Sequence, residues 1–76
     1  MKKTFKIGEC AVGGIITVER KKKVKENQAP FDINFLDWNT KQIIASYHAY
    51  SSDDIYDVLM DNTTHYWADK IASQFN

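Results

Sequence analysis

The chain has 76 residues, of which 43% are hydrophobic and 26% charged, and these ordinary proportions predict one small globular domain over residues 1–76 and exclude a disordered chain. A single cysteine, Cys10, excludes a domain held together by internal disulfides. No apolar run approaches the length of a membrane span, and Lys6 and Glu9 interrupt any signal-peptide core, so we expect a cytoplasmic protein without a membrane partner.

The net charge is zero, but the two halves of the chain carry opposite charges. Residues 1–26 hold eight Lys or Arg and three Glu, a net charge of +5, whereas residues 27–76 hold two Lys and seven Asp, a net charge of −5. If the halves stay apart in the fold, the surface is segregated by charge. A homodimer in which the positive half of one copy meets the negative half of another is one interpretation of this pattern.

Two apolar patterns near the N-terminus predict a β-hairpin. In Thr4–Glu9, Phe5 and Ile7 alternate with polar residues, and Ile15–Arg20 is rich in β-branched side chains. Consecutive glycines interrupt the pattern between them, so the connection is expected within Cys10–Gly14. A single long strand with a glycine bulge is the alternative.

A basic stretch follows, with five basic residues among the seven from Arg20 to Glu26. We interpret it as a solvated connection between strands, because connections of this kind usually lie on the surface. The alternative is direct binding of nucleic-acid phosphates, in which Lys2 and Lys3 would join the stretch if the first two strands pair. No aromatic residue lies within it to stack on bases. The residues expected to contact an acidic or phosphate surface are Arg20, Lys21, Lys22, Lys23 and Lys25.

Two further strands predict a second, tight antiparallel hairpin. Phe31–Leu36 alternates apolar and polar residues, and Gln42–Tyr50 is a less regular strand. Between them, Asp37–Thr40 has the composition of a turn. Trp38 lies in this turn, so we expect its side chain either to fold back over the sheet or to be offered to a partner as an apolar anchor.

The period of the pattern changes after residue 50. Ser51 and Asp54 resemble a capping box with Asp in place of the usual Glu, and they predict a helical region over residues 53–75. Asn62–Thr64 is a weak break, so this region forms one helix or two. Trp67, Ile71 and Phe75 recur at helical spacing and predict an apolar stripe.

Four strands followed by helix predict an α+β domain, in which a small antiparallel sheet is covered on one face by the C-terminal helix or helix pair. The other face of the sheet would be wet or would meet a partner. The helical stripe is expected to pack on Phe5, Ile16, Val18, Phe31, Ile33 and Phe35.

Residues that could carry chemistry form no convincing set, so we expect a protein that is not an enzyme and that holds no cofactor or metal. Cys10 could pair with His48 or His65, but no motif supports such a pair, and the adjacent Glu9 disfavours a thiolate. The glycines match no phosphate-binding pattern.

An acidic row on the predicted helix has two interpretations. Asp61, His65 and Asp69 are spaced by four residues and could share a metal ion if the helix is continuous, but such rows are more often solvated faces. Alternatively, Asp53, Asp57 and Asp61 could meet a basic groove on a partner.

Together, a basic stretch, an acidic helix and a tryptophan in a turn favour a small module that binds a protein or nucleoprotein partner. In size, composition and lack of a catalytic set, the chain resembles the short accessory proteins of phages and mobile genetic elements, among them the anti-CRISPR inhibitors. The resemblance implies a stoichiometric inhibitor that docks on a host complex in the host cytoplasm. It is carried by the whole chain and by no motif, so it assigns no role to any residue.

Overall fold

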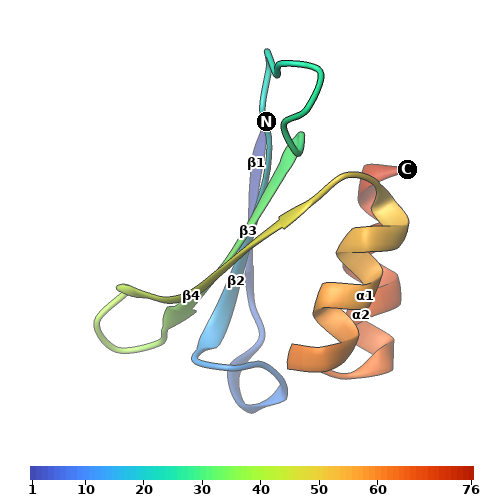
Figure 1. The fold of residues 1–76 in the computed structure, drawn as a ribbon. Helices are drawn as coiled ribbons and strands as arrows, with labels where there is room; N and C mark the ends of the chain where they lie inside the picture. The colour runs from blue at the N-terminus through green and yellow to red at the C-terminus, as the bar shows by residue number, and fades with distance from the viewer.

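The computed structural model describes residues 1–76 and has the α+β architecture expected from the sequence, a four-stranded antiparallel sheet followed by two helices (Figure 1). The strands lie side by side in chain order, so the first and last strands form the two edges of the sheet. The elements are β1 (Lys2–Lys6), η1 (Gly8–Cys10), β2 (Gly14–Arg20), β3 (Phe31–Asp37), β4 (Ile43–Ala49), α1 (Ser52–Asn62), α2 (His65–Ala72) and η2 (Ser73–Phe75).

The predicted first hairpin is confirmed, with β1 antiparallel to β2. Its first strand ends earlier than predicted, because β1 stops at Lys6 and Gly8–Cys10 form the short 3-10 turn η1. Gly13, which ends the connection, has a φ of +75°, and a Cβ atom there would lie 2.5 Å from the Leu36 carbonyl oxygen. Only glycine therefore lets the connection pack directly against β3.

The second hairpin is also confirmed, with its connection shifted by one residue along the chain. Residues 38–42 separate β3 from β4, and the Asp37 carboxylate organises them by accepting the backbone N–H groups of Asn39 and Thr40 at 2.9 Å each. Lys41 closes the turn at a φ of +64°. A register shift opposite Phe35 and Leu36 then marks a β-bulge in the ladder.

Two helices form the C-terminal region. The hydroxyl of Ser51 accepts the Asp54 N–H at 3.2 Å, as a capping box requires, but the Asp54 carboxylate accepts the Tyr50 N–H at 2.9 Å instead of reaching back to the cap residue. The predicted break is real, since α1 ends at Asn62 and the Thr64 hydroxyl caps α2.

Both helices pack on the same face of the sheet and enclose the core (Figure 1). The predicted stripe is confirmed for Ile71 and Phe75, whereas Trp67 is half-buried at the margin. The Phe75 ring meets the Phe31 ring edge-on at 5.8 Å between centroids. The fully enclosed side chains of the core are Ile16, Val18, Ile33, Phe35, Ile55, Leu59 and Ile71.

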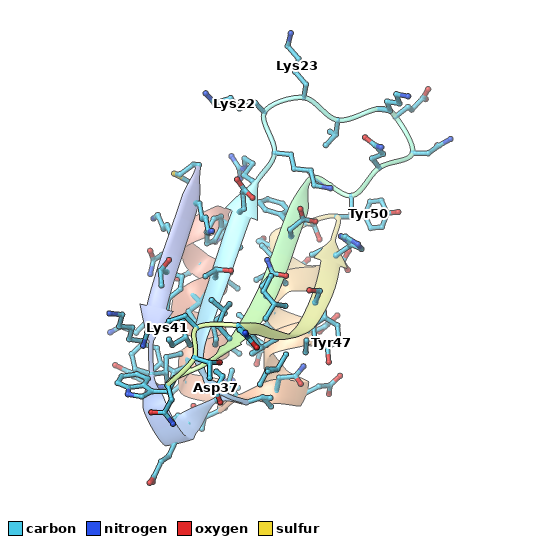
Figure 2. All side chains as sticks on the ribbon, turned by 90° about the vertical axis from the view of Figure 1, so that its left-hand side faces the viewer. Lys22, Lys23, Asp37, Lys41, Tyr47 and Tyr50 are labelled. Atoms are coloured by element: carbon cyan, nitrogen blue, oxygen red, sulfur yellow. The ribbon has the colours of Figure 1, made fainter.

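No helix covers the other face of the sheet, which Figure 2 views directly. Because side chains alternate along a strand, three cross-strand rows lie on it. The β3–β4 turn curls away from the helices and over the end of this face that carries the third row (Figures 1 and 2), where Ile15 is only 2% exposed. The rows are Lys2, Glu19, Asp32 and His48; Thr4, Thr17, Asn34 and Ser46; and Lys6, Ile15, Leu36 and Ile43.

Candidate interaction surfaces

The basic loop (residues 21–30) connects β2 to β3 at one end of the sheet. The side chains of Lys22, Lys23 and Lys25 are exposed and make no hydrogen bond or ion pair, and Figure 2 shows Lys22 and Lys23 pointing away from the sheet. Lys21 instead lies 3.3 Å from the Asp32 carboxylate. Three of the five predicted cationic contacts are thus free to meet a partner.

Arg20, the remaining residue of the five, has a structural role. Its guanidinium donates to the Phe75 carbonyl oxygen at 3.0 Å and lies over the Phe31 ring at 5.0 Å from the centroid. It therefore ties the end of β2 to η2 and to the core.

The N-terminal lysines reach the basic loop only in part. The Met1 amino group donates to the Arg20 carbonyl at 3.1 Å, which places the start of β1 beside the loop, as expected from the pairing. Lys2 and Lys3 then point to opposite faces of the sheet. Lys3 is directed to the helix layer, where its ammonium donates to the Gln74 side chain at 3.0 Å.

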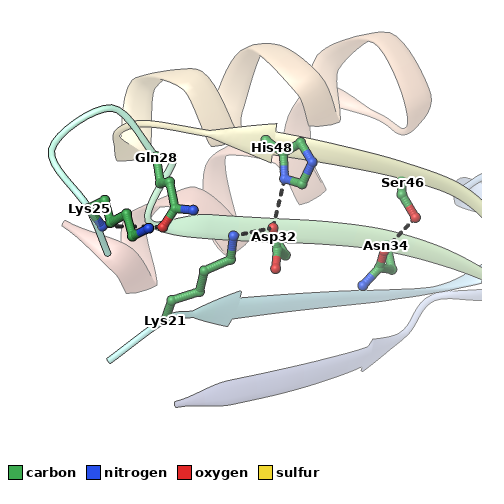
Figure 3. A network of polar contacts seen from close by, with 7 residues as sticks. All are labelled: Lys21, Lys25, Gln28, Asp32, Asn34, Ser46 and His48. Carbon is green, nitrogen blue, oxygen red and sulfur yellow. Dashed lines mark hydrogen bonds and ion pairs between the residues drawn. The ribbon is translucent and has the colours of Figure 1, made fainter. Parts of the chain in front are cut away.

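A polar network joins the basic loop to the uncovered face (Figure 3). Asp32 lies at its centre, with the Lys21 ammonium at 3.3 Å and Nδ1 of His48 at 2.7 Å. Further along the same face, the Ser46 hydroxyl donates to the Asn34 side-chain oxygen at 2.7 Å. These contacts link β3 to β4 across the face that has no helix.

Trp38 folds back over the sheet, which is one of the two arrangements expected from the sequence, and it stays partly exposed. Its backbone N–H donates to the Gly13 carbonyl at 2.8 Å, and its ring packs so closely on Gly14 that a Cβ atom there would lie 3.2 Å from the ring. Lys41 lies over the ring at 5.3 Å from its centroid and donates to the Trp38 carbonyl. The side chain is folded against the sheet, yet 45% of it remains exposed.

The last strand and the connections on either side of it carry exposed apolar side chains from Trp38, beside Gly14 at one end of the sheet, to Tyr50, beside the basic loop at the other. Five of the ten large hydrophobic residues exposed in this protein fall between positions 38 and 50, a small fraction of the chain. We call this set the β4 surface. Its members are Trp38 (45% exposed), Ile43 (59%), Ile44 (51%), Tyr47 (37%) and Tyr50 (63%).

The backbone direction in β3 is defined at both ends of its ladder with β2. The Lys21 N–H donates to the Pro30 carbonyl, and the Trp38 N–H donates to the Gly13 carbonyl, both at 2.8 Å. In an antiparallel strand, successive residues direct their backbone groups alternately to the two neighbours. Even-numbered residues of β3 therefore bond to β2, and odd-numbered residues bond to β4.

The outward-facing backbone groups of β4 follow from this alternation. The residues opposite the odd-numbered positions of β3 are Ala45, Tyr47 and Ala49, so these three bond within the sheet. The N–H and C=O groups of Ser46 and His48 point outward, where no strand follows. β4 is thus an open edge whose unpaired groups are available to another strand.

The acidic residues of α1 lie on two sides of the helix, its outer face and one flank. Asp53 and Asp57 are exposed and lie opposite the buried face of the helix. Asp54, Val58 and Asp61 follow one another at helical spacing along a flank of α1. The opposite flank meets α2 through the contact of Tyr56 with His65. Asp54 accepts the Tyr50 N–H at the end of β4, whereas Asp61, at the other end of α1, lines the hollow beside residues 9–12.

Residues considered for catalysis or metal binding are not brought together. Cys10 is exposed in an open, shallow hollow of about 460 Å³ that neither histidine lines. The break after α1 separates Asp61 from His65 and Asp69, and His65 packs against a tyrosine ring. No three acidic, histidine or cysteine side chains are grouped as metal ligands would be.

Two side chains have shifted pKa values, and both shifts have local structural causes. The backbone N–H groups of Thr40 and Asn39 hold the pKa of Asp37 below its ordinary value. The Tyr66 hydroxyl, which accepts from the Lys70 ammonium at 3.0 Å, raises the pKa of Lys70. Neither shift involves a histidine or the cysteine.

Sequence reasoning identified Trp38 as an anchor and Tyr47 and Tyr50 as side chains that could extend its patch, but it missed Ile43 and Ile44, which it assigned to an ordinary strand. The signal that could have found them is the charge pattern: residues 42–69 contain no Lys or Arg, so the last strand lacks the charges that usually protect an edge.

Comparison with known proteins gives no guide to these surfaces. No protein-family model matches the chain, and no match appears among the curated proteins or the solved structures. The helices also offer no membrane span, since neither is long and apolar enough to cross a bilayer.

Proposed function

We propose that this protein is a non-enzymatic interaction module that docks on a protein partner through the β4 surface. The observation that carries the proposal is the concentration of exposed aromatic and aliphatic side chains along the last strand and its turn. Large apolar side chains supply much of the binding energy at protein interfaces, and an exposed group of them commonly marks an interaction site.

Trp38 is the central anchor in this proposal. Its backbone is fixed by the hydrogen bond to Gly13, and Lys41 covers part of its ring, so its orientation is set before a partner arrives. A side chain that is already ordered loses little conformational entropy on binding. A phage-encoded inhibitor that blocks a host complex is one form that such a module takes, and it stays a prediction.

Direct nucleic-acid binding is the second candidate function, and the basic loop favours it. Lys22, Lys23 and Lys25 have no partner within the chain, so they could neutralise phosphates without breaking an internal contact. Such binding would weaken steeply as the salt concentration rises. The module would then dock on the protein part of a nucleoprotein complex through the β4 surface and on its nucleic acid through the basic loop.

Affinity capture with three forms of the full chain tests the main proposal. We expect the wild-type protein to retain a specific partner from a native lysate and the Trp38→Ala, Tyr50→Ala double variant to lose it. Tyr66→Ala is the matched control, because Tyr66 is an exposed tyrosine on α2 outside the β4 surface. Partners retained equally by all three forms would overturn the proposal.

A gel-retardation assay with DNA and RNA separates the second candidate. Substituting glutamate for Lys22, Lys23 and Lys25 should abolish salt-sensitive retardation if the basic loop binds phosphates. Absence of retardation by the wild-type protein at low salt would remove nucleic-acid binding and leave protein docking unaffected.

A further inference from the structure

We propose that β4 accepts an extended segment of a partner as a fifth strand, and that this segment carries lysine or arginine at the positions facing the helix layer. The inference rests on the proposed function and specifies both the mode of docking and the chemistry of the partner. Strand addition to an open edge is a known mode of peptide recognition, in which backbone hydrogen bonds give affinity and side-chain pockets give selectivity.

The backbone of β4 provides the hydrogen-bonding template. Ser46 and His48 direct their N–H and C=O groups outward, and no element of the chain pairs with them. The side chains beside them do not obstruct an approaching strand, since Ser46 is tied to Asn34 and His48 to Asp32 on the uncovered face. An added strand would find these groups held in place.

The opposite edge does not offer the same template. β1 has the sequence KKTFK, in which three of five residues are lysines, and lysines along an edge oppose pairing with another strand. β4 has the sequence IIASYHA, with no Lys, Arg, Asp, Glu or Pro. Strand addition is therefore expected at one edge of the sheet only.

Charge decides which partner fits. Residues 42–69 comprise β4, α1 and the start of α2, and they contain five Asp and no Lys or Arg. Asp54 lies at the C-terminal end of β4, where its carboxylate accepts the Tyr50 N–H, and Asp61 follows on the same flank of α1 at its other end, beside residues 9–12. Basic side chains of an added strand near the end of β4 would meet the Asp54 carboxylate within this acidic segment.

Tyr47 adds a second reason for basic side chains. Its ring lies on the helix-facing side of β4, edge-on to Phe35 at 5.7 Å between centroids, and it remains partly exposed. The small residues Ala45 and Ala49 flank it on the same side of the strand. Lysine or arginine stems can pack over this ring while their charged ends reach the carboxylates of α1.

A second copy of this chain fits the edge less well. Symmetric pairing of β4 with β4 of another copy would bring two acidic flanks together, with like charges opposed. β1 of another copy would bring lysines, but its helix-facing Lys3 is already bonded to Gln74 and lies over the Phe75 ring. We therefore commit to a different, basic partner.

Two synthetic peptides of about seven residues, the length of a typical edge strand, test the inference on the full chain. One alternates lysine with valine, and the other alternates glutamate with valine. In amide NMR spectra of the labelled protein, we expect the lysine peptide to shift the signals of Ile44, Ser46 and His48 and to bind at least about tenfold more tightly than the glutamate peptide at low salt.

Proline variants test the strand mode. Ser46→Pro removes one outward N–H and the side-chain bond to Asn34 but no backbone hydrogen bond to β3. It should therefore bind the peptide at least about tenfold more weakly than Ser46→Ala, which removes the side-chain bond alone. Thr4→Pro is the matched control, because the hydrogen bonds Arg20 N to Met1 O and Ile7 N to Gly14 O place the N–H of Thr4 outward on the opposite edge. Thr4→Pro should bind like the wild type.

Charge variants test the chemistry independently of the backbone. Asp61→Lys should weaken the lysine peptide about tenfold and strengthen the glutamate peptide, because Asp61 lies on the same flank of α1 as Asp54, away from α2. Asp57→Lys makes the same charge change on the outer face of the same helix and should alter binding less than about threefold.

The inference is overturned if both peptides bind equally, if neither binds, or if Ser46→Pro binds as well as Ser46→Ala. It is also overturned if light scattering shows twice the monomer mass with the β4 amide signals altered, because the edge would then belong to a second copy. If a captured partner is lost by the Trp38 and Tyr50 variant but retained by Ser46→Pro, strand addition fails while the proposed docking function stands.

Discussion

The two edges of this sheet are built differently. β1 is short, carries three lysines, and lies beside contacts that tie its side of the sheet to the C-terminal segment, Lys3 to Gln74 and Arg20 to the Phe75 carbonyl. β4 is longer, carries no formal charge, and has exposed apolar side chains. Edges of β-sheets are usually protected against pairing, and this contrast is the reason why we propose β4 as the docking edge.

The largest expected effect on stability comes from placing proline at a β4 residue whose N–H group bonds to β3. Tyr47→Pro removes a hydrogen bond of the ladder with β3 and the ring that packs on Phe35, so we expect a loss of about 3 kcal/mol in the free energy of unfolding. Ser46→Pro should cost only about 1 kcal/mol, because its N–H has no partner and the one bond lost is the exposed side-chain bond to Asn34. Urea denaturation measures both, and equal losses would contradict the assigned direction of the β4 backbone.

The next largest effect concerns how much the contacts of Arg20, on the β1 side of the sheet, contribute to stability. Arg20→Met removes the hydrogen bond to Phe75 and the cation over the Phe31 ring, and it should lower the free energy of unfolding by about 2 kcal/mol. Lys23→Met, in the same basic stretch, should change it by less than about 0.5 kcal/mol, since Lys23 is free. Thermal denaturation of the two variants would show similar melting temperatures if Arg20 were only a solvated cation.

A single substitution should make the two edges alike. Ile44→Lys gives β4 the kind of charge that β1 carries, so we expect capture of the partner to fall at least about tenfold, a loss of about 1.4 kcal/mol. Stability should change by less than about 1 kcal/mol, because half of the side chain is exposed. Binding that survives this change would show that the edge is not used.

The smallest effect concerns the turn that leads into β4. The pKa of Asp37 is lowered in the folded protein, so its stabilising contribution is present above the pKa of the unfolded chain and is lost as the pH falls through the folded value. Asp37→Asn should therefore show a shallower fall in melting temperature below about pH 4 than the wild type. The same slope in both proteins would mean that other carboxylates account for the acid sensitivity.

The fold was largely predictable because its signals are local. Alternation in residues 31–36, β-branched residues in 15–20 and the caps at Ser51 and Thr64 each specify their own element, and strands joined in chain order need no long-range information to pair. The predicted end of the first strand was wrong because a tertiary contact determines it. Gly13 packs closely on β3, and this packing sets the path of the chain through η1.

The candidate site was predicted only in part. The basic residues and Trp38 are visible in the sequence because charge runs and rare aromatics are conspicuous, but sequence did not separate the structural Arg20 from the free Lys22 and Lys23. The exposure of Ile43 and Ile44 depends on β4 being an edge and on the bulge that precedes it, which are properties of the assembled sheet.

The order of elements along the chain also has a consequence for biosynthesis. All four strands precede both helices, and Phe75, which closes the core over Phe31, comes after them. Because a ribosome releases the N-terminal part first, the nascent sheet leaves it with its helix-facing side uncovered. During that interval the apolar side of the sheet and the open edge of β4 are both accessible, and we expect the nascent chain to be a substrate for molecular chaperones until η2 has docked.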